Sequence, residues 1–388
     1  MPTVAPNSPI ENRRIVNVRA LTSPKRLYRD LPLTEGHRQA VFSTRSAIAS
    51  ILDGSDTRML VVVGPCSIHD PVAGREYALR LAGLAELLKN DLCVVMRAYF
   101  EKPRTTVGWK GLINDPMLDG TFRVDEGLFL ARAFLLEAIS LGVPVGCEFL
   151  DPITAQYLAD TVSWGSIGAR TTLSQIHRQL ASGLSMPIGF KNAPDGDVQA
   201  AVDAVSCATS SQVFPGIDEE GRAALFETSG NPDAHLVLRG GSAGPNFCES
   251  DVADALKRLD AAGLPGRVLI DASHANSAKD YRRQPVVAAD IAKNVADGDR
   301  RIVGLMLESF LVPGRQDLTP GGAGSLVFGQ SITDACIGWD TTMAVLCHLA
   351  EAVGHRRERS PSTVGVGERA VSSGPAHQTS IYHPTAAT

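Results

Sequence analysis

Eight short apolar runs, separated by longer amphipathic stretches, form the dominant pattern of the chain. Each run is rich in β-branched or other apolar residues, with little polar alternation. This is typical of parallel strands that are buried on both faces. The runs cover residues 59–66, 92–100, 143–149, 163–169, 187–192, 236–240, 268–274 and 302–309.

The stretches between the runs have the length and apolar spacing of helices. They cover residues 74–88, 128–141, 153–161, 174–183, 197–208, 249–262 and 286–297. Because strand and helix alternate eight times, we predict an α/β fold, a (β/α)8 TIM barrel, over residues 46–354. A doubly wound sheet is the alternative, but no GxGxxG segment follows the first run.

Three segments lie outside this alternation. Residues 1–45 form an N-terminal extension, or arm, with a short strand predicted at 14–19 and a helix from 34 to 52. Between the fifth and sixth runs, two apolar segments flank Asp-Glu-Glu-Gly at 218–221, which predicts an inserted β-hairpin within about 210–230. We expect the arm and hairpin to serve assembly or regulation, and residues 355–388 to be a disordered tail.

Composition narrows the class of protein. The 388 residues carry a formal net charge of −5, which argues against broad nucleic-acid binding. No apolar run approaches the ~18 residues of a membrane helix, and residues 1–17 lack the apolar core of a secretory signal. Seven cysteines without a CxxC pair are expected to be reduced thiols. We therefore expect a cytoplasmic enzyme or binding protein with no membrane or nucleic-acid partner.

Polar residues end or directly follow the eight runs. In a barrel these positions meet at the carboxyl ends of the strands, where active sites form. One such residue is easily a satisfied polar group at a strand end, but eight ionisable groups on one rim are costly to bury without a function. They are Cys66, Arg97, Glu148, Arg170, Lys191, Arg239, His274 and Glu308.

These residues divide into two chemical groups. Cys66, His274 and Glu308, with Asp334, offer sulfur, nitrogen and oxygen ligands, which suit one divalent transition ion such as Mn²⁺, Fe²⁺, Co²⁺ or Zn²⁺. The other group is cationic and favours small, strongly anionic substrates, with a solvated basic face as the alternative. Its members are Arg97, Lys102, Arg104, Lys110, Arg170, Lys191 and Arg239. A metal beside such a pocket indicates an aldol-like condensation, and no Walker A motif supports nucleotide phosphoryl transfer.

Seven long motifs resemble one enzyme family, the class I, aromatic-amino-acid-regulated 3-deoxy-D-arabino-heptulosonate 7-phosphate (DAHP) synthases. They are GPCSIHD at 64–70, MRAYFEKPRTTVGWKGLINDP at 96–116, SWGSIGARTT at 163–172, GFKN at 189–192, LRGG at 238–241, IDASHANS at 270–277 and SITDACIGW at 331–339. The resemblance implies condensation of phosphoenolpyruvate, D-erythrose 4-phosphate and water to DAHP and phosphate. This is the first step of the shikimate pathway to chorismate and the aromatic amino acids. It also implies a homo-oligomer, a dimer or a tetramer.

Matching the motifs residue by residue implies a role for each site residue. The metal ligands become Cys66, His274, Glu308 and Asp334. The phosphoenolpyruvate-binding positions become Arg97, Lys102, Arg170, Lys191 and Arg239, while Arg104 and Thr105 fall at the phosphate of erythrose 4-phosphate. We expect Lys102 to be the acid for the aldehyde oxygen, with a lowered pKa among arginines. Glu148 and Lys191 are candidates for holding the attacking water.

The resemblance also implies an inhibitor site near the hairpin, partly lined by a neighbouring subunit. The candidate residues are Asp151, Gln156, Leu184, Ser185, Phe214, Gly216, Ile217 and Phe226. Gly216 stands where phenylalanine-sensitive members carry a serine, so we expect the aromatic effector to be tyrosine, with tryptophan or no effector as the alternatives.

Two rival functions stay open at this point. The first is 3-deoxy-manno-octulosonate 8-phosphate synthase, which accepts arabinose 5-phosphate and whose sugar-phosphate loop resembles KANRSS. This chain has KPRTT at 102–106, which favours the four-carbon sugar. The second is a catalytically inactive barrel that binds an aromatic amino acid or a partner enzyme, but all four expected metal ligands are present.

Overall fold

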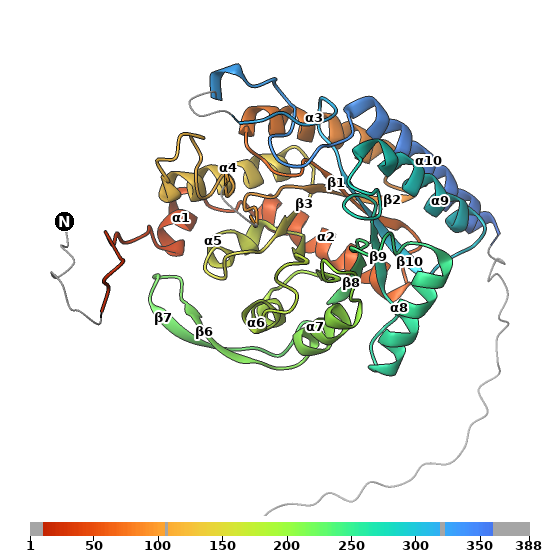
Figure 1. Ribbon diagram of the computed structural model, residues 1–388, viewed down its shortest axis with the longest axis horizontal. Helices are drawn as coiled ribbons and strands as arrows, with labels where there is room; N and C mark the ends of the chain where they lie inside the picture. Colours follow the sequence, from red (N-terminus) through yellow and green to blue (C-terminus); the bar gives the residue numbers. More distant parts are fainter. Residues whose placement is uncertain (1–10, 105–107, 319–322, 360–388) are drawn as a thin grey trace, which may run out of the picture.

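A closed parallel barrel forms the centre of the molecule in the computed structural model, which describes residues 11–104, 108–318 and 323–359 (Figure 1). Within these residues the barrel has eight strands. They are β1 (Met59–Gly64), β2 (Leu92–Arg97), β3 (Val145–Glu148), β4 (Trp164–Ile167), β5 (Ile188–Lys191), β8 (His235–Leu238), β9 (Val268–Asp271) and β10 (Ile302–Glu308). The predicted (β/α)8 fold is confirmed.

The strands follow one another around the barrel in chain order, and β1 pairs with β10 to close it. The register sets Gly64, the last residue of β1, beside Glu308, the last residue of β10. Because every neighbouring pair is parallel, all carboxyl ends lie at one end of the barrel. The polar residues at the ends of the predicted runs therefore meet there.

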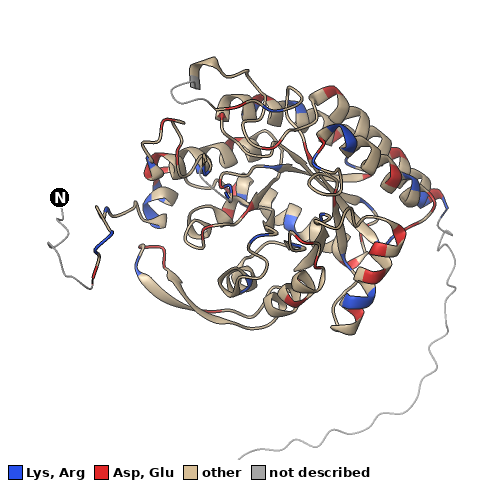
Figure 2. Cartoon of the chain, viewed as in Figure 1, with Lys and Arg blue, Asp and Glu red and all other residues tan. Residues whose placement is uncertain are grey.

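One helix follows each barrel strand and packs outside it (Figure 1). The outer helices are α3 (Pro71–Leu88), α4 (Val124–Ser140), α5 (Ala155–Leu158), α6 (Gln175–Gly183), α7 (Gln199–Thr209), α8 (Glu249–Ala261), α9 (Gln284–Ala296) and α10 (Trp339–Glu358). Acidic and basic residues are interspersed along α8, α9 and α10, as Figure 2 shows. These helices therefore carry charges of both signs.

Alternating strand residues fill the barrel interior, and helix α2 (Glu35–Asp53) covers its amino-terminal end. Leu60 and Val62 face inward, where Ile48 and Ile51 of α2 pack in the same buried cluster as Trp164. This apolar plug leaves the opposite end of the barrel for polar chemistry. Helix α2 confirms the helix predicted at 34–52.

The N-terminal arm differs from its prediction in one element. Residues 14–19 form no strand and are exposed, since an isolated extended segment has no partner for its backbone within the described chain. The short helix α1 (Pro24–Asp30), which Ser23 caps, was not predicted.

The predicted boundaries of the barrel region differ from the observed helices. Helix α2 spans the expected boundary at residue 45, and α10 continues beyond residue 354. The rest of the predicted tail, residues 360–388, lies outside the described residues.

The predicted hairpin is present between β5 and β8. Its antiparallel strands are β6 (Val213–Ile217) and β7 (Ala223–Glu227), and they pair only with each other among the described strands. The hairpin runs along the outside of the barrel below α6 and α7 and ends near α1 (Figure 1). There the amide of Lys25 donates to the carbonyl of Glu219 at 2.8 Å.

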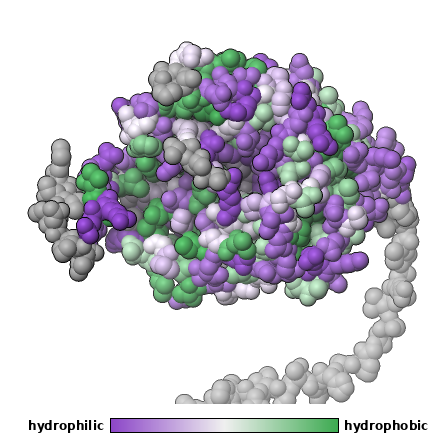
Figure 3. Space-filling model, viewed as in Figure 1, coloured by the Kyte–Doolittle hydropathy of each residue, from purple (hydrophilic) through white to green (hydrophobic). Residues whose placement is uncertain are grey.

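The surface is largely hydrophilic on the face shown in Figure 3, with hydrophobic side chains scattered between polar ones. Exposed apolar residues of the arm include Ile15, Val16 and Val18. Within the described residues, none of the helices combines the length and apolar character that a membrane span requires.

Candidate active site

A cavity of about 720 Å³ opens at the carboxyl ends of the barrel strands. The structure brings most of the predicted site residues into its lining. These are Arg97, Lys102, Arg104, Glu148, Arg170, Lys191, Arg239, His274, Glu308 and Asp334. Cys66 is fully buried beside this lining. Lys110 is exposed and is not among the described lining residues, and Thr105 lies outside the described residues.

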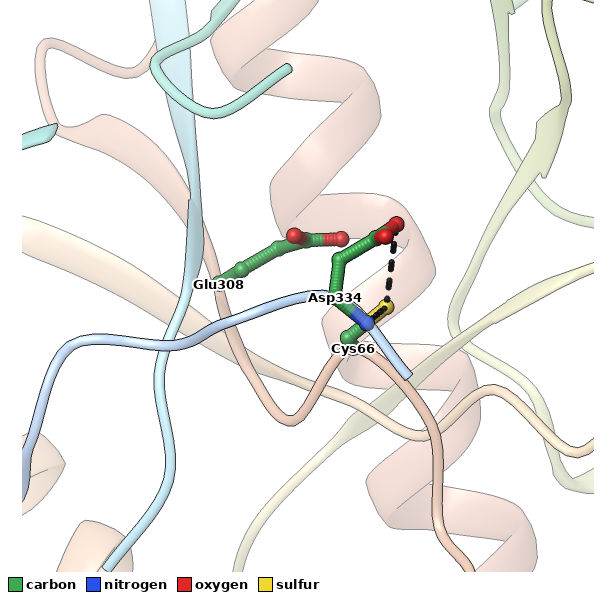
Figure 4. Close-up of side chains that lie close together, drawn as sticks. All are labelled: Cys66, Glu308 and Asp334. Atoms are coloured by element: carbon green, nitrogen blue, oxygen red, sulfur yellow. Dashed lines mark hydrogen bonds between the residues drawn. The ribbon is translucent and has the colours of Figure 1, made fainter. Parts of the chain in front are cut away.

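Three of the four expected metal ligands form one compact group. The ligand atoms of Cys66, Glu308 and Asp334 all lie within 4.8 Å of one another. Figure 4 shows these side chains approaching from the turn after β1, the end of β10 and the loop before α10. Cys66 Sγ is 3.6 Å from Asp334 Oδ2. A thiolate and two carboxylates in such proximity suit a divalent transition ion.

The fourth expected ligand, His274, stands at the edge of this group. Its Nε2 atom is 4.0 Å from Glu308 Oε1, which is too long for a hydrogen bond. Two ligand atoms that are each ~2.0–2.2 Å from one ion lie about 3 to 4 Å apart, depending on the angle at the ion, so the spacing here is at the wide end for a shared ion. His274 has a backbone φ of 55°, in the left-handed region.

The backbone explains how these distant residues meet. Gly64 has a φ of 158°, and a Cβ atom there would lie 2.6 Å from the carbonyl oxygen of Arg97. The glycine therefore lets β1 pass close to β2 before the chain turns to Cys66. The Asp334 loop is tied to β10, because the amide of Ile337 donates to the carbonyl of Glu308 at 2.9 Å.

The surroundings of Cys66 favour the neutral thiol, whereas a metal ion binds the thiolate. Burial and the nearby Glu308 carboxylate raise the pKa of the Cys66 thiol to about 11. A bound divalent ion reverses this balance, since it stabilises the thiolate directly. The donor set therefore fits a metal that itself deprotonates the sulfur.

Arg97 is the most deeply buried cation of the cavity. Its Nη2 atom donates to Glu308 Oε1 at 3.0 Å, and its guanidinium lies 3.6 Å from the centroid of the Tyr99 ring. Burial would lower the pKa of Arg97, but Tyr99 and Glu308 outweigh it and raise it. Arg97 therefore stays charged and fixed, with its fork held at the metal-binding group.

Lys102 differs from its prediction. Its Nζ atom lies 3.1 Å from Cys66 Sγ and 3.2 Å from the carbonyl oxygen of Cys66. Burial and the neighbouring Arg97 lower the pKa of Lys102. The Cys66 sulfur, Glu308 and Glu148 raise it and outweigh them, so the pKa of Lys102 is raised. The prediction of a lowered pKa is wrong because it counted only the neighbouring arginines.

Gly168 leaves room for the carboxylate of Glu148. Glu148 is buried at the end of β3, and a Cβ atom at Gly168 would lie 2.1 Å from Glu148 Oε1. Since Gly168 directly follows β4 and lies two residues before Arg170, this close approach sets the carboxylate beside the basic side of the cavity. Glu148 thus faces the space between the cations.

Three residues at the mouth were missed by the sequence analysis. Lys279 and Arg315 line the cavity from loops, where no apolar pattern marks them. Asp271 is the last residue of β9, and its Oδ2 atom lies 2.9 Å from Lys191 Nζ. Burial would raise the pKa of Asp271, but His274 and Lys191 lower it well below the usual range. Its strand-end position is the signal in the sequence, but the predicted run extends beyond it to His274.

A second cavity, of about 1060 Å³, lies outside the barrel between α2, α6, the hairpin and the α1 region. Five of the eight predicted effector residues line it, namely Gln156, Leu184, Ser185, Phe214 and Phe226. The rings of Phe214 and Phe226 stack with centroids 5.8 Å apart. Asp151, Gly216 and Ile217 are not among the described lining residues.

Comparison with known proteins identifies relatives over nearly the whole barrel. The family described as "DAHP synthetase I family" matches residues 33–347. The Phe-sensitive phospho-2-dehydro-3-deoxyheptonate aldolase of Escherichia coli K12 is 52% identical over 347 residues, which cover 89% of this chain and 98% of the relative. The Tyr-sensitive enzyme of the same organism is 48% identical, covering 87% of this chain and 94% of the relative.

A solved structure shows the same architecture. The phospho-2-dehydro-3-deoxyheptonate aldolase of Francisella tularensis SCHU S4 superimposes with a TM-score of 0.86 at 47% sequence identity. The match covers 88% of this chain and 99% of that chain. Both the sequence and the fold therefore show that the chain belongs to the DAHP synthetase I family.

Proposed function

We propose that the protein catalyses a metal-dependent condensation of phosphoenolpyruvate with D-erythrose 4-phosphate and water, giving DAHP and phosphate. DAHP synthase activity itself follows from membership of the family. The metal dependence rests on one observation, the convergence of Cys66, Glu308 and Asp334 beside His274 in a cavity lined by cations.

Cys66, His274, Glu308 and Asp334 would hold one divalent transition ion. Sulfur, nitrogen and two carboxylate donors favour Mn²⁺, Fe²⁺, Co²⁺ or Zn²⁺ over Ca²⁺ and Mg²⁺. When bound, such an ion polarises the aldehyde carbonyl of erythrose 4-phosphate. We propose no particular ion among the four.

The cations of the cavity bind and orient the two anionic substrates. Arg97, Arg170 and Arg239 present planar forks that match carboxylate and phosphate oxygens, and Lys191 adds a compact charge. Arg104 lines the same cavity near its rim, where it would contact the phosphate of the sugar together with Thr105. This placement sets the C3 carbon of phosphoenolpyruvate against the aldehyde carbon.

The reaction forms one carbon–carbon bond and one carbon–oxygen bond, the latter from water, and it breaks the carbon–oxygen bond to phosphate. C3 attacks the aldehyde carbon, and positive character develops at C2 of phosphoenolpyruvate. Water held by Glu148 and Lys191 adds at C2 and gives up a proton, and the resulting phosphohemiketal expels phosphate by C–O cleavage. Because its pKa is raised, Lys102 stays protonated and donates a hydrogen bond to the aldehyde oxygen as negative charge develops there.

Release of phosphate from phosphoenolpyruvate tests the proposal directly. The purified protein with Mn²⁺ is assayed with erythrose 4-phosphate and, separately, with arabinose 5-phosphate. We expect rapid release with the four-carbon sugar. Faster release with arabinose 5-phosphate would favour 3-deoxy-manno-octulosonate 8-phosphate synthase activity, and no release with either sugar would favour an inactive barrel. Normal turnover after exhaustive chelation would contradict the metal dependence.

We also propose that an aromatic amino acid inhibits the enzyme from the second cavity, with tyrosine as the expected effector. Stacked Phe214 and Phe226 provide an apolar wall for an aromatic side chain. Arg45 and Asp160 on the same lining carry charges opposite to those of an amino acid's carboxylate and ammonium groups. Titration with tyrosine, phenylalanine and tryptophan in the phosphate-release assay identifies the effector. Equal rates at all concentrations of the three would contradict this proposal.

Finally, we propose that the chain forms a homo-oligomer, a dimer or a tetramer, through the arm. Val16 is 97% exposed and Val18 55% exposed, and the arm extends away from the barrel (Figure 1). Exposed apolar residues in series favour a protein contact. Sedimentation velocity of the wild-type chain and of Val16→Asp tests this, and a monomeric wild type would contradict it.

A further inference from the structure

One buried carboxylate, that of Asp271, connects the two halves of the mouth. Asp271 ends β9 and is fully buried. Its Oδ2 atom lies 2.9 Å from Lys191 Nζ and 2.9 Å from His274 Nδ1. Its Oδ1 atom accepts from the amide of Ser273 at 3.0 Å and from the Ser273 hydroxyl at 2.6 Å. Both oxygens are therefore fully used inside the protein.

These contacts determine which nitrogen of His274 carries a proton. A carboxylate only accepts hydrogen bonds, so the contact with Asp271 requires a proton on Nδ1. Ser273 Oγ also lies 2.7 Å from Nδ1, but its single hydrogen is already donated to Asp271. The hydroxyl therefore acts as a second acceptor for the same Nδ1–H group. With two acceptors at Nδ1, the Nε2 atom keeps its lone pair.

The same contacts also fix the direction of the imidazole ring. Nδ1 is held against the carboxyl end of β9, and Nε2 consequently points to Glu308 Oε1, 4.0 Å away. His274 begins a turn, in which the amide of Lys279 donates to the carbonyl of His274 at 2.7 Å. Backbone and side chain thus both restrict the ring, and a neutral ligand atom faces the compact group of Cys66, Glu308 and Asp334.

On its other side, Asp271 holds the ammonium group of Lys191. Lys191 ends β5 and is almost fully buried, while its side chain lines the cavity. Strand β8 lies between β5 and β9, so the ion pair spans the barrel interior. A flexible lysine side chain held at one point loses less conformational entropy when a substrate anion binds.

We propose that Asp271 is a positioning residue that holds His274 as the Nδ1–H tautomer facing the metal position and, through the same oxygen, holds Lys191 facing the anion cavity. The inference rests on the proposed metal dependence, and it adds a residue that touches neither metal nor substrate. Because one carboxylate serves both groups, metal binding and phosphoenolpyruvate binding are coupled, and the coupling is reciprocal.

The Asp271→Asn variant tests the metal half of the proposal. The amide keeps the size of the side chain but is a weaker acceptor and offers an N–H donor to His274. Affinity for Mn²⁺ is measured by competition with a chromogenic chelator, without substrates. We expect a loss of about 10- to 100-fold, the usual effect of removing a partner of a ligating histidine. In the Co²⁺-substituted protein, the d–d bands of the variant should shift relative to those of the wild type.

Asp299→Asn provides a matched control. The carboxylate of Asp299 is partly buried and also holds a cation, accepting from Arg301 Nη2 at 2.8 Å, but it precedes β10 at the opposite end of the barrel. Its metal affinity and Co²⁺ spectrum should equal those of the wild type. If Asp299→Asn weakens Mn²⁺ binding as much as Asp271→Asn does, the effect is general destabilisation and the proposal is wrong.

A double variant covers the case in which Asp271→Asn fails to fold because Lys191 is left unpaired. Asp271→Asn with Lys191→Met removes both charges, and Lys191→Met alone provides its reference. We expect Lys191→Met to bind Mn²⁺ at least as tightly as the wild type, and the double variant to bind it about 10- to 100-fold more weakly than Lys191→Met. Equal metal affinity of these two variants would overturn the assignment.

The coupling is measured with phosphoenolpyruvate alone, without the sugar phosphate. In the wild type, Mn²⁺ should increase the affinity for phosphoenolpyruvate in isothermal titration, and the increase should shrink in Asp271→Asn. An unchanged increase would overturn the shared-carboxylate proposal. A wild type that binds no divalent ion would instead contradict the proposed function itself, so the two failures are distinguishable.

Discussion

The two cavities of this molecule are built in different ways. The mouth cavity takes most of its side chains from the ends of barrel strands, whose positions follow from one closed hydrogen-bonded register. The outer cavity is assembled from α2, α6, a separate hairpin and the α1 region. Hydrogen bonds between segments that are far apart in the chain join these pieces, among them Lys25 to Glu219 and the Tyr28 hydroxyl to the carbonyl of Gln156. A cavity set by one closed register suits catalysis, and a cavity assembled from separate segments would suit the proposed regulation, because segments outside the register can move independently of it.

Removal of the metal should have the largest effect on the rate of phosphate release, and this effect should arise in the mouth cavity alone. In Cys66→Ser, a neutral hydroxyl replaces the thiolate ligand, and we expect the rate of phosphate release to fall about 1000-fold or more, since a metal contributes several kcal/mol to such a step. Chelation of the wild type should give the same loss, reversed by Mn²⁺. Cys248→Ser, on the exposed start of α8, serves as control. A wild-type rate of phosphate release from Cys66→Ser in the presence of Mn²⁺ would contradict the assignment.

Arg97→Met should separate stability from metal binding. The substitution leaves the buried Glu308 carboxylate unpaired, which we expect to cost about 3–5 kcal/mol of unfolding free energy without metal. Mn²⁺ should restore part of this loss, because the ion compensates the same carboxylate. Arg132→Met is the control, since Arg132 is equally buried but pairs with Asp160, remote from the mouth. Urea unfolding measures both variants, and equal recovery by Mn²⁺ in both would contradict the role of Glu308.

Glu101 lies next to Lys102 and accepts from Thr154 Oγ1, just before α5, so it connects the loops of the two cavities. Burial, opposed by the Thr154 hydrogen bond, raises the pKa of Glu101 from its ordinary 4.5 to about 7. The folded state then binds more protons than the unfolded state between these values. Stability is therefore full below about pH 4.5 and falls as pH rises to about 7, by up to ~3 kcal/mol.

The Glu101→Gln variant removes this contribution without removing the acceptor oxygen. Unfolding free energies of the variant and the wild type are measured by urea from pH 4.5 to 8. The unfolding free energy of the variant, relative to that of the wild type, should increase as the pH rises. Parallel curves would contradict the raised pKa of Glu101 in the folded protein.

Phe226→Ala should give the smallest effect, and it should be confined to the outer cavity. Loss of the ring stacked on Phe214 opens the apolar wall, and we expect the effector concentration for half-inhibition to rise about 10-fold or more. The rate without effector should stay within about twofold of the wild type, because the ring lies outside the barrel. A fall in the uninhibited rate as large as the loss of inhibition would contradict the separation of the two cavities.

The same contrast decides which features could be predicted from sequence. Strands and their polar ends follow from apolar runs such as 92–97, because burial on both faces imposes that composition. Asp271 was missed because a run that ends in several polar residues does not show which of them reaches the interior. The prediction of a strand at 14–19 was wrong because a strand needs a second strand to pair with, and the local sequence pattern does not reveal whether one is present. The raised pKa of Lys102 depends on Cys66, Glu308 and Glu148, which only the fold brings beside it.

The left-handed backbone of His274 limits how this position can be exchanged. At a φ of 55°, most side chains are strained, whereas glycine, asparagine and aspartate are tolerated more readily. Aspartate is the one residue of these three that supplies an anionic ligand. A change from histidine to aspartate would give a site with three carboxylates and one thiolate, closer to the preference of harder cations. The turn therefore restricts which substitutions at His274, engineered or natural, would change the metal preference of the proposed site.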